Sequence, residues 1–450
     1  MEIRERLKNE QKKLEEIVCR GLEYAKKSGV TEAYMNIGQS TGLSVSTLNG
    51  DVENIEFNKS RGMSVTVYSD GRRGRSSTSD LSKEAVESAV DAAYSIARHT
   101  SRDPDAVLPD DDLLVPASEI RDLDLCHPSE ADSESAIALL SKTEKLALAM
   151  DPRLKRSHGA DYGYSYGVGV MGNPHGVCSG YPTSSYSISL GLIGEKDGAV
   201  ETSGSFTHSR YPDRLMSAEE LAREAADRTL RKLGPRKVQT MRVPIILENH
   251  LAAGLFGVLA SAISGRHQYQ HTTFLDGKLG EKVLPDWVTV HENPFIRGAY
   301  GSSPFDDEGV RVSVSDIVSC GKLSQYLLST YTARKLGMRS NGHCGGIYNW
   351  FVTNNTFDGL SSLLKMMGKG IFVTSLMGEG ASVIDGNFSR GAFGFWVEDG
   401  EIRYPVHEFT VAGNMKDVFS NMVAMANDYD PRLGIQSGSV LIDDIAVAGI

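Results

Sequence analysis

Residues 243–257 read V-P-I-I-L-E-N-H-L-A-A-G-L-F-G and join an apolar run to a segment of small and aliphatic residues. The branched side chains of residues 243–247 favour a strand, and the Ala- and Leu-rich part that follows favours a helix. Glu248, Asn249 and His250 stand between the two. A strand-to-helix step often carries catalytic or metal-binding groups, because rigid structure holds it on both sides. This stretch therefore predicts the rim of a cleft.

The composition predicts an ordinary soluble globular protein. The chain has 450 residues, enough for two or three domains, with 40% hydrophobic and 23% charged residues. Its 47 basic and 58 acidic residues give a net charge of −11. This balance argues against a broad surface for nucleic acid or for an anionic membrane.

Targeting signals and cysteines point to the cytoplasm. The first sixteen residues are charged throughout and have no apolar core, so they do not resemble a secretory signal. No stretch approaches the roughly 20 apolar residues of a membrane span. The five cysteines lie far apart without a C-x-x-C pair, which predicts free thiols.

Hydrophobic periodicity divides the first half into helices and hairpins. Turn signals at Asn49-Gly50 and Asp70-Gly71 predict antiparallel hairpins, and an acidic run without periodicity at 101–112 predicts an exposed connection. Ser217 and Glu220 form a predicted capping box. The order of strands followed by a helix occurs twice, which indicates a duplication. The predicted helices are 4–27, 81–98, 132–150 and 217–233, and the predicted strand-rich segments are 32–77 and 155–207.

The Gly-Pro step at 234–235 predicts the main domain boundary. We expect an N-terminal α+β domain at 1–235, with a subdivision near 101–130, and a β-rich C-terminal domain at 240–450. The fold class of the whole chain is therefore α+β. The C-terminal predictions are helices at 249–263 and 358–368 and strands at 288–291, 310–314, 370–375, 393–397 and 401–404.

The candidate ligand and nucleophile motifs of this chain are incomplete. His267 and His271 have helical ligand spacing, but their surroundings lack an apolar stripe and a base, which favours a polar loop. His343-Cys344 offers two adjacent ligands that rarely bind one ion, so a Gly-rich loop with a buried thiol is favoured. The chain has no G-x-S-x-G elbow and no complete phosphate-binding loop.

Residues 376–400, L-M-G-E-G-A-S-V-I-D-G-N-F-S-R-G-A-F-G-F-W-V-E-D-G, concentrate glycines, aromatic residues and charges. Such a segment suits either a sheet edge that receives an extended peptide or an interior hairpin with tight turns. Composition favours the interior hairpin. The candidates for peptide docking or for lining a chamber are His271, His343, Glu379, Arg390, Phe393 and Trp396.

The same segment, continued to residue 408, resembles the TldE/PmbA family, together with V-A-G-N-M-K-D-V-F at 411–419 and I-Q-S-G-S-V-L-I-D-D-I-A-V-A-G at 435–449. The segments T-T-F-L-D-G-K-L-G-E-K-V, V-T-V-H-E-N-P and H-C-G-G-I-Y-N-W fit the same pattern. The resemblance implies a subunit of a TldD/TldE-type metallopeptidase, a system that cleaves unfolded or extended peptides. An older name for the family is modulator of DNA gyrase.

The resemblance also implies which residues would carry the chemistry. The TldD-like subunit has an H-E-x-x-x-H motif at the strand-to-helix junction and a cysteine near its C-terminus as zinc ligands. Aligned on G-L-F-G at 254–257, this chain has Glu248 and Ala253 at the two histidine positions, Asn249 at the glutamate and Ser437 near the cysteine. An amide cannot take a proton from zinc-bound water, and a methyl group cannot bind zinc.

We therefore expect a non-catalytic chain without a metal or other cofactor, paired as a heterodimer with a zinc-bearing TldD-like subunit; a homodimer of the isolated chain is also conceivable. We expect no nucleic-acid or membrane partner. Two other classes are open from the sequence. One is a peptide- or protein-binding regulator, as the gyrase name suggests. The other is a stand-alone metallopeptidase with unfamiliar ligands such as His250, His271, His343 and Cys344.

Overall fold

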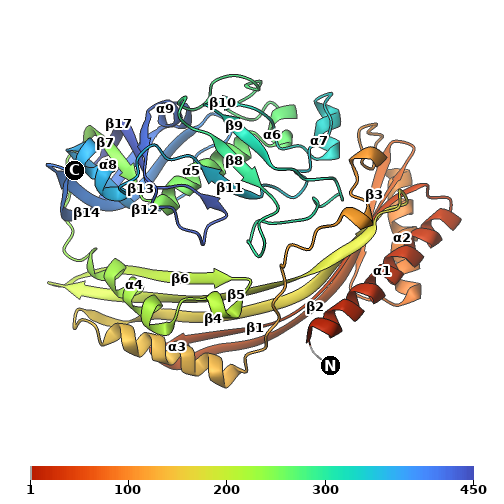
Figure 1. Ribbon diagram of the computed structural model, residues 1–450, viewed down its shortest axis with the longest axis horizontal. Coiled ribbons are helices and arrows are strands. Elements are labelled where there is room, and N and C mark those ends of the chain that lie inside the picture. Colours follow the sequence, from red (N-terminus) through yellow and green to blue (C-terminus); the bar gives the residue numbers. More distant parts are fainter. Residues whose placement is uncertain (1–2) are drawn as a thin grey trace.

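The computed structural model describes residues 3–450 and has the predicted α+β class. A long curved sheet with four helices forms the N-terminal region, and two smaller sheets with short helices form the C-terminal region above it (Figure 1). Among the described helices, none combines the length and the apolar character needed to cross a membrane.

The N-terminal region repeats one pattern, a helix, three strands and a helix. The two copies share a single antiparallel sheet with the order β3-β2-β1-β4-β5-β6, and the long β1–β4 pair joins them. This arrangement explains the strand and helix order that occurs twice in the sequence. The first copy consists of α1 (Ile3–Lys27), β1 (Glu32–Leu48), β2 (Asp51–Ser69), β3 (Arg72–Thr78) and α2 (Lys83–His99). The second consists of α3 (Ser133–Leu148), β4 (Leu154–Gly172), β5 (Cys178–Lys196), β6 (Ala199–Ser209) and α4 (Ala218–Leu230).

The two faces of this sheet differ because the strands alternate large apolar and small polar residues. Along β4, Tyr162, Tyr164 and Val168 are buried against the helices, whereas Asp161 before them and Ser165 among them are exposed. All four helices lie on the apolar face, because their core residues form two clusters with these strands. The Gly- and Ser-rich face is left toward the C-terminal region (Figure 1).

The turns and the helix cap that the sequence predicts in this region are confirmed. Asn49 and Gly50 have φ angles of 54° and 89°, and Asp70 and Gly71 have φ angles of 50° and 67°. Two-residue hairpin turns require such positive φ angles. The capping box of α4 is present in both directions, between Ser217 and Glu220.

The acidic run at 101–112 is not a free connection. Asp103 and Asp105 both contact Lys335 across 2.8 Å, and Asp112 pairs with Arg339 across 2.7 Å. The run thus lies on the basic α7 (Thr330–Lys335) of the C-terminal region. The prediction missed this contact because the acidic and basic partners are more than 200 residues apart.

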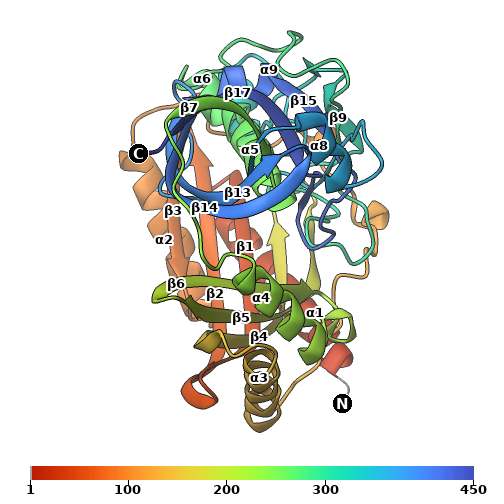
Figure 2. The same cartoon turned by 90° about the vertical axis from the view of Figure 1, so that its left-hand side faces the viewer.

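In the C-terminal region a six-stranded sheet, β14-β13-β12-β7-β17-β15, curls into a ring because β14 also pairs with β17. Figure 2 shows this ring around α5 (Asn249–Ala262). Side chains of α5 share one core cluster with the strands. The strands are β7 (Met241–Leu247), β12 (Gly370–Met377), β13 (Asn387–Glu398), β14 (Glu401–Asn414), β15 (Met422–Met425) and β17 (Val440–Ala448); α8 (Leu360–Met367) and α9 (Met415–Ser420) flank them.

The second C-terminal sheet has the order β10-β9-β8-β11-β16 and short strands. The predicted strand at 310–314 is wrong: residue Val310 makes an isolated bridge to Leu114, and the strand begins at Ser315. The elements are α6 (Gly265–Tyr269), β8 (Val290–Asn293), β9 (Ser315–Ser319), β10 (Lys322–Leu323), β11 (Asn349–Val352) and β16 (Ile435–Gln436). Short 3-10 turns lie at Asp111–Leu113, Ala117–Glu119 and Pro212–Arg214.

Candidate functional site

The junction between β7 and α5 forms as the sequence predicts. β7 is fully internal, paired with β12 on one side and β17 on the other. Glu248 leaves the strand in an extended conformation, with φ −59° and ψ 149°, and stands at the N-cap of α5. Its side chain does not cap the helix, so the carboxylate is available to other partners.

Arg231 of the segment after α4 provides the main partner of that carboxylate. Its Nη2 lies 2.9 Å from Oε1 of Glu248, and the Glu248 side chain is only 15% exposed. On the other oxygen, Oε2 lies 3.3 Å from Nδ1 of His250. The Arg231 guanidinium therefore lies next to Glu248, which has the only carboxylate among residues 248–250.

Asn249 is held by two segments that are remote in sequence. Its Nδ2 donates a hydrogen bond to the main-chain carbonyl of Asp428 across 2.6 Å, and its Oδ1 accepts from the main-chain N–H of His250 across 2.7 Å. The hydroxyl of the fully buried Ser437 donates to the carbonyl of Asn249 across 3.5 Å. The structure thus brings position 437, just after β16, to the first turn of α5.

These residues do not fit a zinc ion. Zinc sites in proteins use thiolate, imidazole and carboxylate ligands, usually three or four of them. Ala253 is a buried methyl group, Ser437 donates its proton to a carbonyl, and Glu248 is engaged by Arg231. Within residues 3–450 no three His, Cys, Asp or Glu side chains are grouped so that they could hold a metal ion.

The residues predicted to dock a peptide do not share one surface. Phe393 and Trp396 lie in β13, which is an interior strand between β12 and β14, and both side chains are buried. The peptide-accepting edge is therefore not at β13, and the interior hairpin is the arrangement found. Glu379 is exposed in the loop after β12. His271 is also exposed and pairs with Asp276 across 2.9 Å.

His343 has an interior role. Its Nε2 lies 2.7 Å from Oε2 of Glu292, whose side chain is completely buried, and its Nδ1 lies 2.9 Å from Oδ1 of Asn341. The other oxygen of Glu292 accepts from the Tyr348 main-chain N–H and from Trp350 Nε1. These hydrogen bonds join the second sheet to the loop at 341–348. Both ring nitrogens of His343 and both carboxylate oxygens of Glu292 are engaged in them, so neither side chain is available to a ligand.

Cys344 lies in a Gly-containing loop, as predicted, whereas His267 lies in a short helix and not in the predicted polar loop. Burial, together with the carboxylates of Glu308 and Asp306, raises the pKa of Cys344 far above its usual range. His267 lies in the short helix α6, and its Nδ1 is 3.1 Å from the Thr272 hydroxyl.

A cavity of about 220 Å³ lies between α5 and the concave side of the barrel. The face of α5 that lines it consists of His250, Leu251, Gly254, Leu255 and Val258, whereas Ala253 is on the buried opposite side of the helix. Arg390 of β13 lines the barrel side. Of the candidates predicted for peptide docking, Arg390 alone reaches this cavity. Gly254 inside α5 is the sequence signal for it, because glycine is costly in a helix interior.

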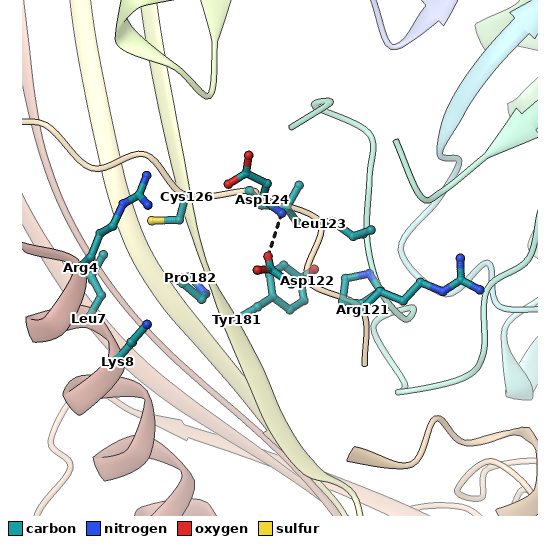
Figure 3. A pocket seen from close by; sticks show the side chains of 12 residues that line it. Arg4, Leu7, Lys8, Arg121, Asp122, Leu123, Asp124, Cys126, Tyr181 and Pro182 are labelled. Atoms are coloured by element: carbon teal, nitrogen blue, oxygen red, sulfur yellow. Dashed lines mark hydrogen bonds between the residues drawn. The ribbon is translucent and has the colours of Figure 1, made fainter. Parts of the chain in front are cut away.

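A second hollow of about 210 Å³ lies where α1 meets the segment before α3 (Figure 3). Its charged side chains are Arg4 and Lys8 of α1 and Arg121, Asp122 and Asp124 of the segment. Basic and acidic groups thus alternate around it, and Asp122 already accepts from the Asp124 main-chain N–H across 2.9 Å. This mixture does not select one class of ligand.

Comparison with known proteins supports a single assignment. Three family models match: PmbA/TldA metallopeptidase domain 1 at residues 37–97, the central domain at 126–233 and the C-terminal domain at 240–449. Metalloprotease PmbA of Escherichia coli O157:H7 is 45% identical over 100% of this chain and 99% of its own length. This chain belongs to the PmbA/TldD family.

Other members of the PmbA/TldD family agree in sequence and fold. A Metalloprotease PmbA homolog of Haemophilus influenzae is 41% identical over 98% of each chain. A crystal structure of a putative modulator of DNA gyrase from Bacteroides thetaiotaomicron has a TM-score of 0.90 at 25% identity, covering 97% of this chain and 98% of the other. TldE from Thermococcus kodakarensis shares the fold, with a TM-score of 0.82 at 22% identity over 95% and 99% of the two chains.

Proposed function

We propose that this chain is the non-catalytic, zinc-free subunit of a two-chain cytoplasmic metallopeptidase, and that it pairs with a TldD-like chain that supplies the zinc. The substrate class that we propose is unfolded or extended peptide. The observation that carries the proposal is the junction of β7 and α5, where Asn249 donates to Asp428, Arg231 pairs with Glu248 and Ala253 contributes only a methyl group.

The chemistry of peptide hydrolysis supports this proposal. A metallopeptidase needs ligands that hold the ion and a base that takes a proton from the attacking water. The side-chain NH₂ of Asn249 is a donor that is already used, and a primary amide has no basic lone pair on nitrogen. The Arg231 guanidinium adds a fixed positive charge beside Glu248, and this charge repels a divalent cation.

The printed name of the Escherichia coli relative is Metalloprotease PmbA. For this chain we propose that a metallopeptidase activity belongs to the pair of subunits. What this subunit contributes is a complete fold: the strands, α5 and the Ser437 segment are all assembled, and their interior is packed. Such a fold suits a partner of similar shape that completes a shared chamber.

The test uses the purified full-length chain and a TldD-like chain from the same genome, alone and mixed. Bound zinc is measured by atomic emission after removal of loosely held metal, and peptidase activity is measured on an unstructured casein fragment. The isolated chain should hold much less than one zinc per molecule and cleave nothing. The mixture should cleave the fragment faster than the TldD-like chain alone.

The matched control changes Glu248 and Ala253 in the purified chain. E248A removes the remaining carboxylate of the junction and A253S keeps a small side chain. Both variants, when mixed with the partner, should still give an active pair, because neither residue serves as a ligand. Stoichiometric zinc in the isolated chain that is lost in E248A would contradict the proposal, as would peptidase activity of the chain without a partner.

A regulator that binds proteins without any peptidase is the second candidate. It is favoured only by the name modulator of DNA gyrase that the Bacteroides relative carries. Capture of a topoisomerase subunit in the absence of any TldD-like chain, at equal purified concentrations, would make it the better proposal. A stand-alone enzyme that uses His250, His271, His343 and Cys344 has no supporting geometry, because His343 is committed to Glu292 and His271 to Asp276.

A further inference from the structure

The cavity between α5 and the barrel lies on the face of the helix opposite Ala253, and of Glu248, Asn249 and His250 at the junction only His250 lines it. Apart from His250 and Arg390, every side chain that lines it is apolar or is a glycine. Its volume is about 220 Å³. Apolar cavities of roughly 150 Å³ stay dry and bind molecules of the size of benzene. This cavity therefore has room for an aliphatic group of several carbons.

Its wall carries two polar atoms that are buried and lack a hydrogen-bond partner. They are Nε of Arg390 and Nδ1 of His250. The latter lies 3.3 Å from Oε2 of Glu248 but without the geometry of a hydrogen bond. An unsatisfied buried donor costs on the order of 1–3 kcal/mol, and native proteins retain few of them. Such atoms in the wall of a cavity indicate a missing partner inside it.

The charge of Arg390 identifies that partner as an anion. Nη2 of Arg390 donates weakly to the carbonyls of Leu376 and Gly378, at 3.3 and 3.5 Å. No carboxylate among residues 3–450 forms an ion pair with it, although the chain carries eleven more negative than positive charges. A half-buried guanidinium without a counter-ion favours a carboxylate, which its planar N–H groups match in geometry.

Two glycines that line the cavity, Gly254 of α5 and Gly380 after β12, are exposed, so the cavity opens to solvent beside them. A Cβ atom built on Gly254 would meet no atom within 4 Å. The absence of a side chain at this point therefore leaves the space open. Alanine is favoured over glycine in a helix interior by roughly 1 kcal/mol, so an open cavity here has a cost in stability.

We propose that this cavity binds a small carboxylate with an apolar body, with the carboxylate on Arg390 and the aliphatic part between α5 and the inner face of the barrel. The proposal does not depend on the pairing with a TldD-like chain. Two sources have this chemistry, the C-terminal residue of a peptide that ends in an aliphatic side chain and a free medium-chain carboxylate.

Titration calorimetry on the full-length chain tests this inference with N-acetyl-L-leucine and octanoate as probes. N-acetyl-L-leucinamide and octanamide are the uncharged controls, and acetate is the control without an apolar body. We expect at least one of the two carboxylates to bind, its amide to bind at least tenfold more weakly, and acetate to show no binding, because a charged hydrogen bond and apolar contact both contribute. Stronger binding of N-acetyl-L-leucine points to a peptide terminus, and stronger binding of octanoate points to a free carboxylate.

Substitutions at two positions, Arg390 and Gly254, localise the site. R390M should weaken binding at least tenfold, while R390K, which keeps the charge but not the fork of donors, should weaken it less. G254L places a large side chain on the α5 side of the opening and should weaken binding at least tenfold. G257A is the matched control, because Gly257 lies in the same helix, also has no atom within 4 Å of a built Cβ and does not line the cavity. It should leave the affinity unchanged.

The inference is overturned if neither carboxylate binds at millimolar concentration, if the amides bind as tightly as the acids, or if G254L binds like the unmodified chain. G254A, with a smaller side chain, provides the same comparison if G254L does not fold. Far-ultraviolet circular dichroism and thermal melting of each variant establish folding first. Failure of this test leaves the zinc and peptidase measurements unaffected.

Discussion

The side-chain amide of Asn249 donates a hydrogen bond to the main-chain carbonyl of Asp428 across 2.6 Å, and this contact decides what residue the first turn of α5 tolerates. Asp428 is fixed in turn, because its carboxylate accepts from the main-chain N–H and the hydroxyl of Ser439. Asn249 therefore links the first turn of α5 to the segment before β16.

N249E should destabilise the chain and should not create a peptidase. A glutamate places a carboxylate oxygen where a donor is required, which leaves the Asp428 carbonyl unsatisfied and costs about 1–3 kcal/mol. Urea unfolding measures the loss. N58E, the same change at an exposed position of β2, should alter the free energy of unfolding by less than about 0.5 kcal/mol. Equal stability of N249E and the unmodified chain would mean that this link is not important.

Arg432 should be a strong link between the two regions. Its guanidinium, 18% exposed, lies 2.6 Å from Asp430 and 3.1 Å from Glu224 of α4, and it also donates to the Phe206 carbonyl of β6. R432M leaves Asp430 without its salt-bridge partner, whereas Glu224 keeps Arg228 at 2.7 Å, and the loss should cost about 3 kcal/mol in urea unfolding. R403M, whose partners Asp399 and Glu401 are exposed, should cost less than about 1 kcal/mol.

The same group gives a pH dependence. Burial alone would raise the pKa of Asp430, but hydrogen bonds and charge from Arg432 hold that pKa below its ordinary value. The unfolded value is about 3.9, so the stabilisation is present above that pH and is lost as the pH falls through the lower folded pKa. Between neutral pH and pH 3 the unmodified chain should therefore lose more stability than R432M. Parallel curves for the two proteins would contradict this expectation.

H343A should destabilise the chain without changing its metal content. The substitution leaves the Oε2 of the completely buried Glu292 without a partner, which costs on the order of 3–5 kcal/mol. H271A removes an imidazole that is 75% exposed and should be nearly neutral. Thermal melting with and without added zinc tests both variants. Zinc that stabilises the unmodified chain but not H343A would restore His343 as a metal ligand.

Cys19 and Cys178 should form a disulfide in a mild oxidant. Their sulfur atoms are 3.0 Å apart and connect α1 to the first residue of β5. Diamide accepts the two electrons and two protons that the thiols lose. Burial and the neighbouring Cys19 thiol raise the pKa of Cys178 to about 12, so the reaction should accelerate as the pH rises.

Peptide mass mapping under denaturing conditions detects this bond, and C19S is the control that cannot form it. A loop of this length gives up to about 5 kcal/mol in the chain-entropy model, so the oxidised chain should melt at a higher temperature. The exposed Cys320 should remain a single thiol. Modification of Cys19 and Cys178 one by one, without a bond between them, would contradict the expectation.

The sequence predicts best what depends on neighbours in the chain. The caps at Ser217, the turns at Asn49 and Asp70 and the helix at α5 follow from local patterns, and all of them form. Residues 310–314 were predicted as a strand from their alternation of Val with polar residues, yet Val310 has a single bridge partner. Alternation shows that a segment has two faces, but strand pairing depends on which segment lies beside it.

The candidate site was predictable only in part for the same reason. Asn249 and Ser437 are 188 residues apart, and no periodicity places them within 3.5 Å of each other. His343 and Trp396 are residue types that are common in binding surfaces, but both side chains are buried. Their burial depends on the complete fold and cannot be predicted from the neighbouring sequence. Arg390 is the candidate whose charge without a partner becomes visible only when the surrounding carboxylates are placed in space.

The position of β7 between β12 and β17 has a consequence for biosynthesis. The two partners of β7 are at residues 370–377 and 440–448, so a strand that leaves the ribosome early waits for nearly the whole second half of the chain. The N-terminal sheet, in contrast, pairs strands within the first 209 residues. During translation the first region is complete while β7 still exposes unpaired N–H and C=O groups, which are prone to aggregation. A nascent chain interrupted before Val440 would therefore leave one edge of β7 unpaired and the barrel open on that side.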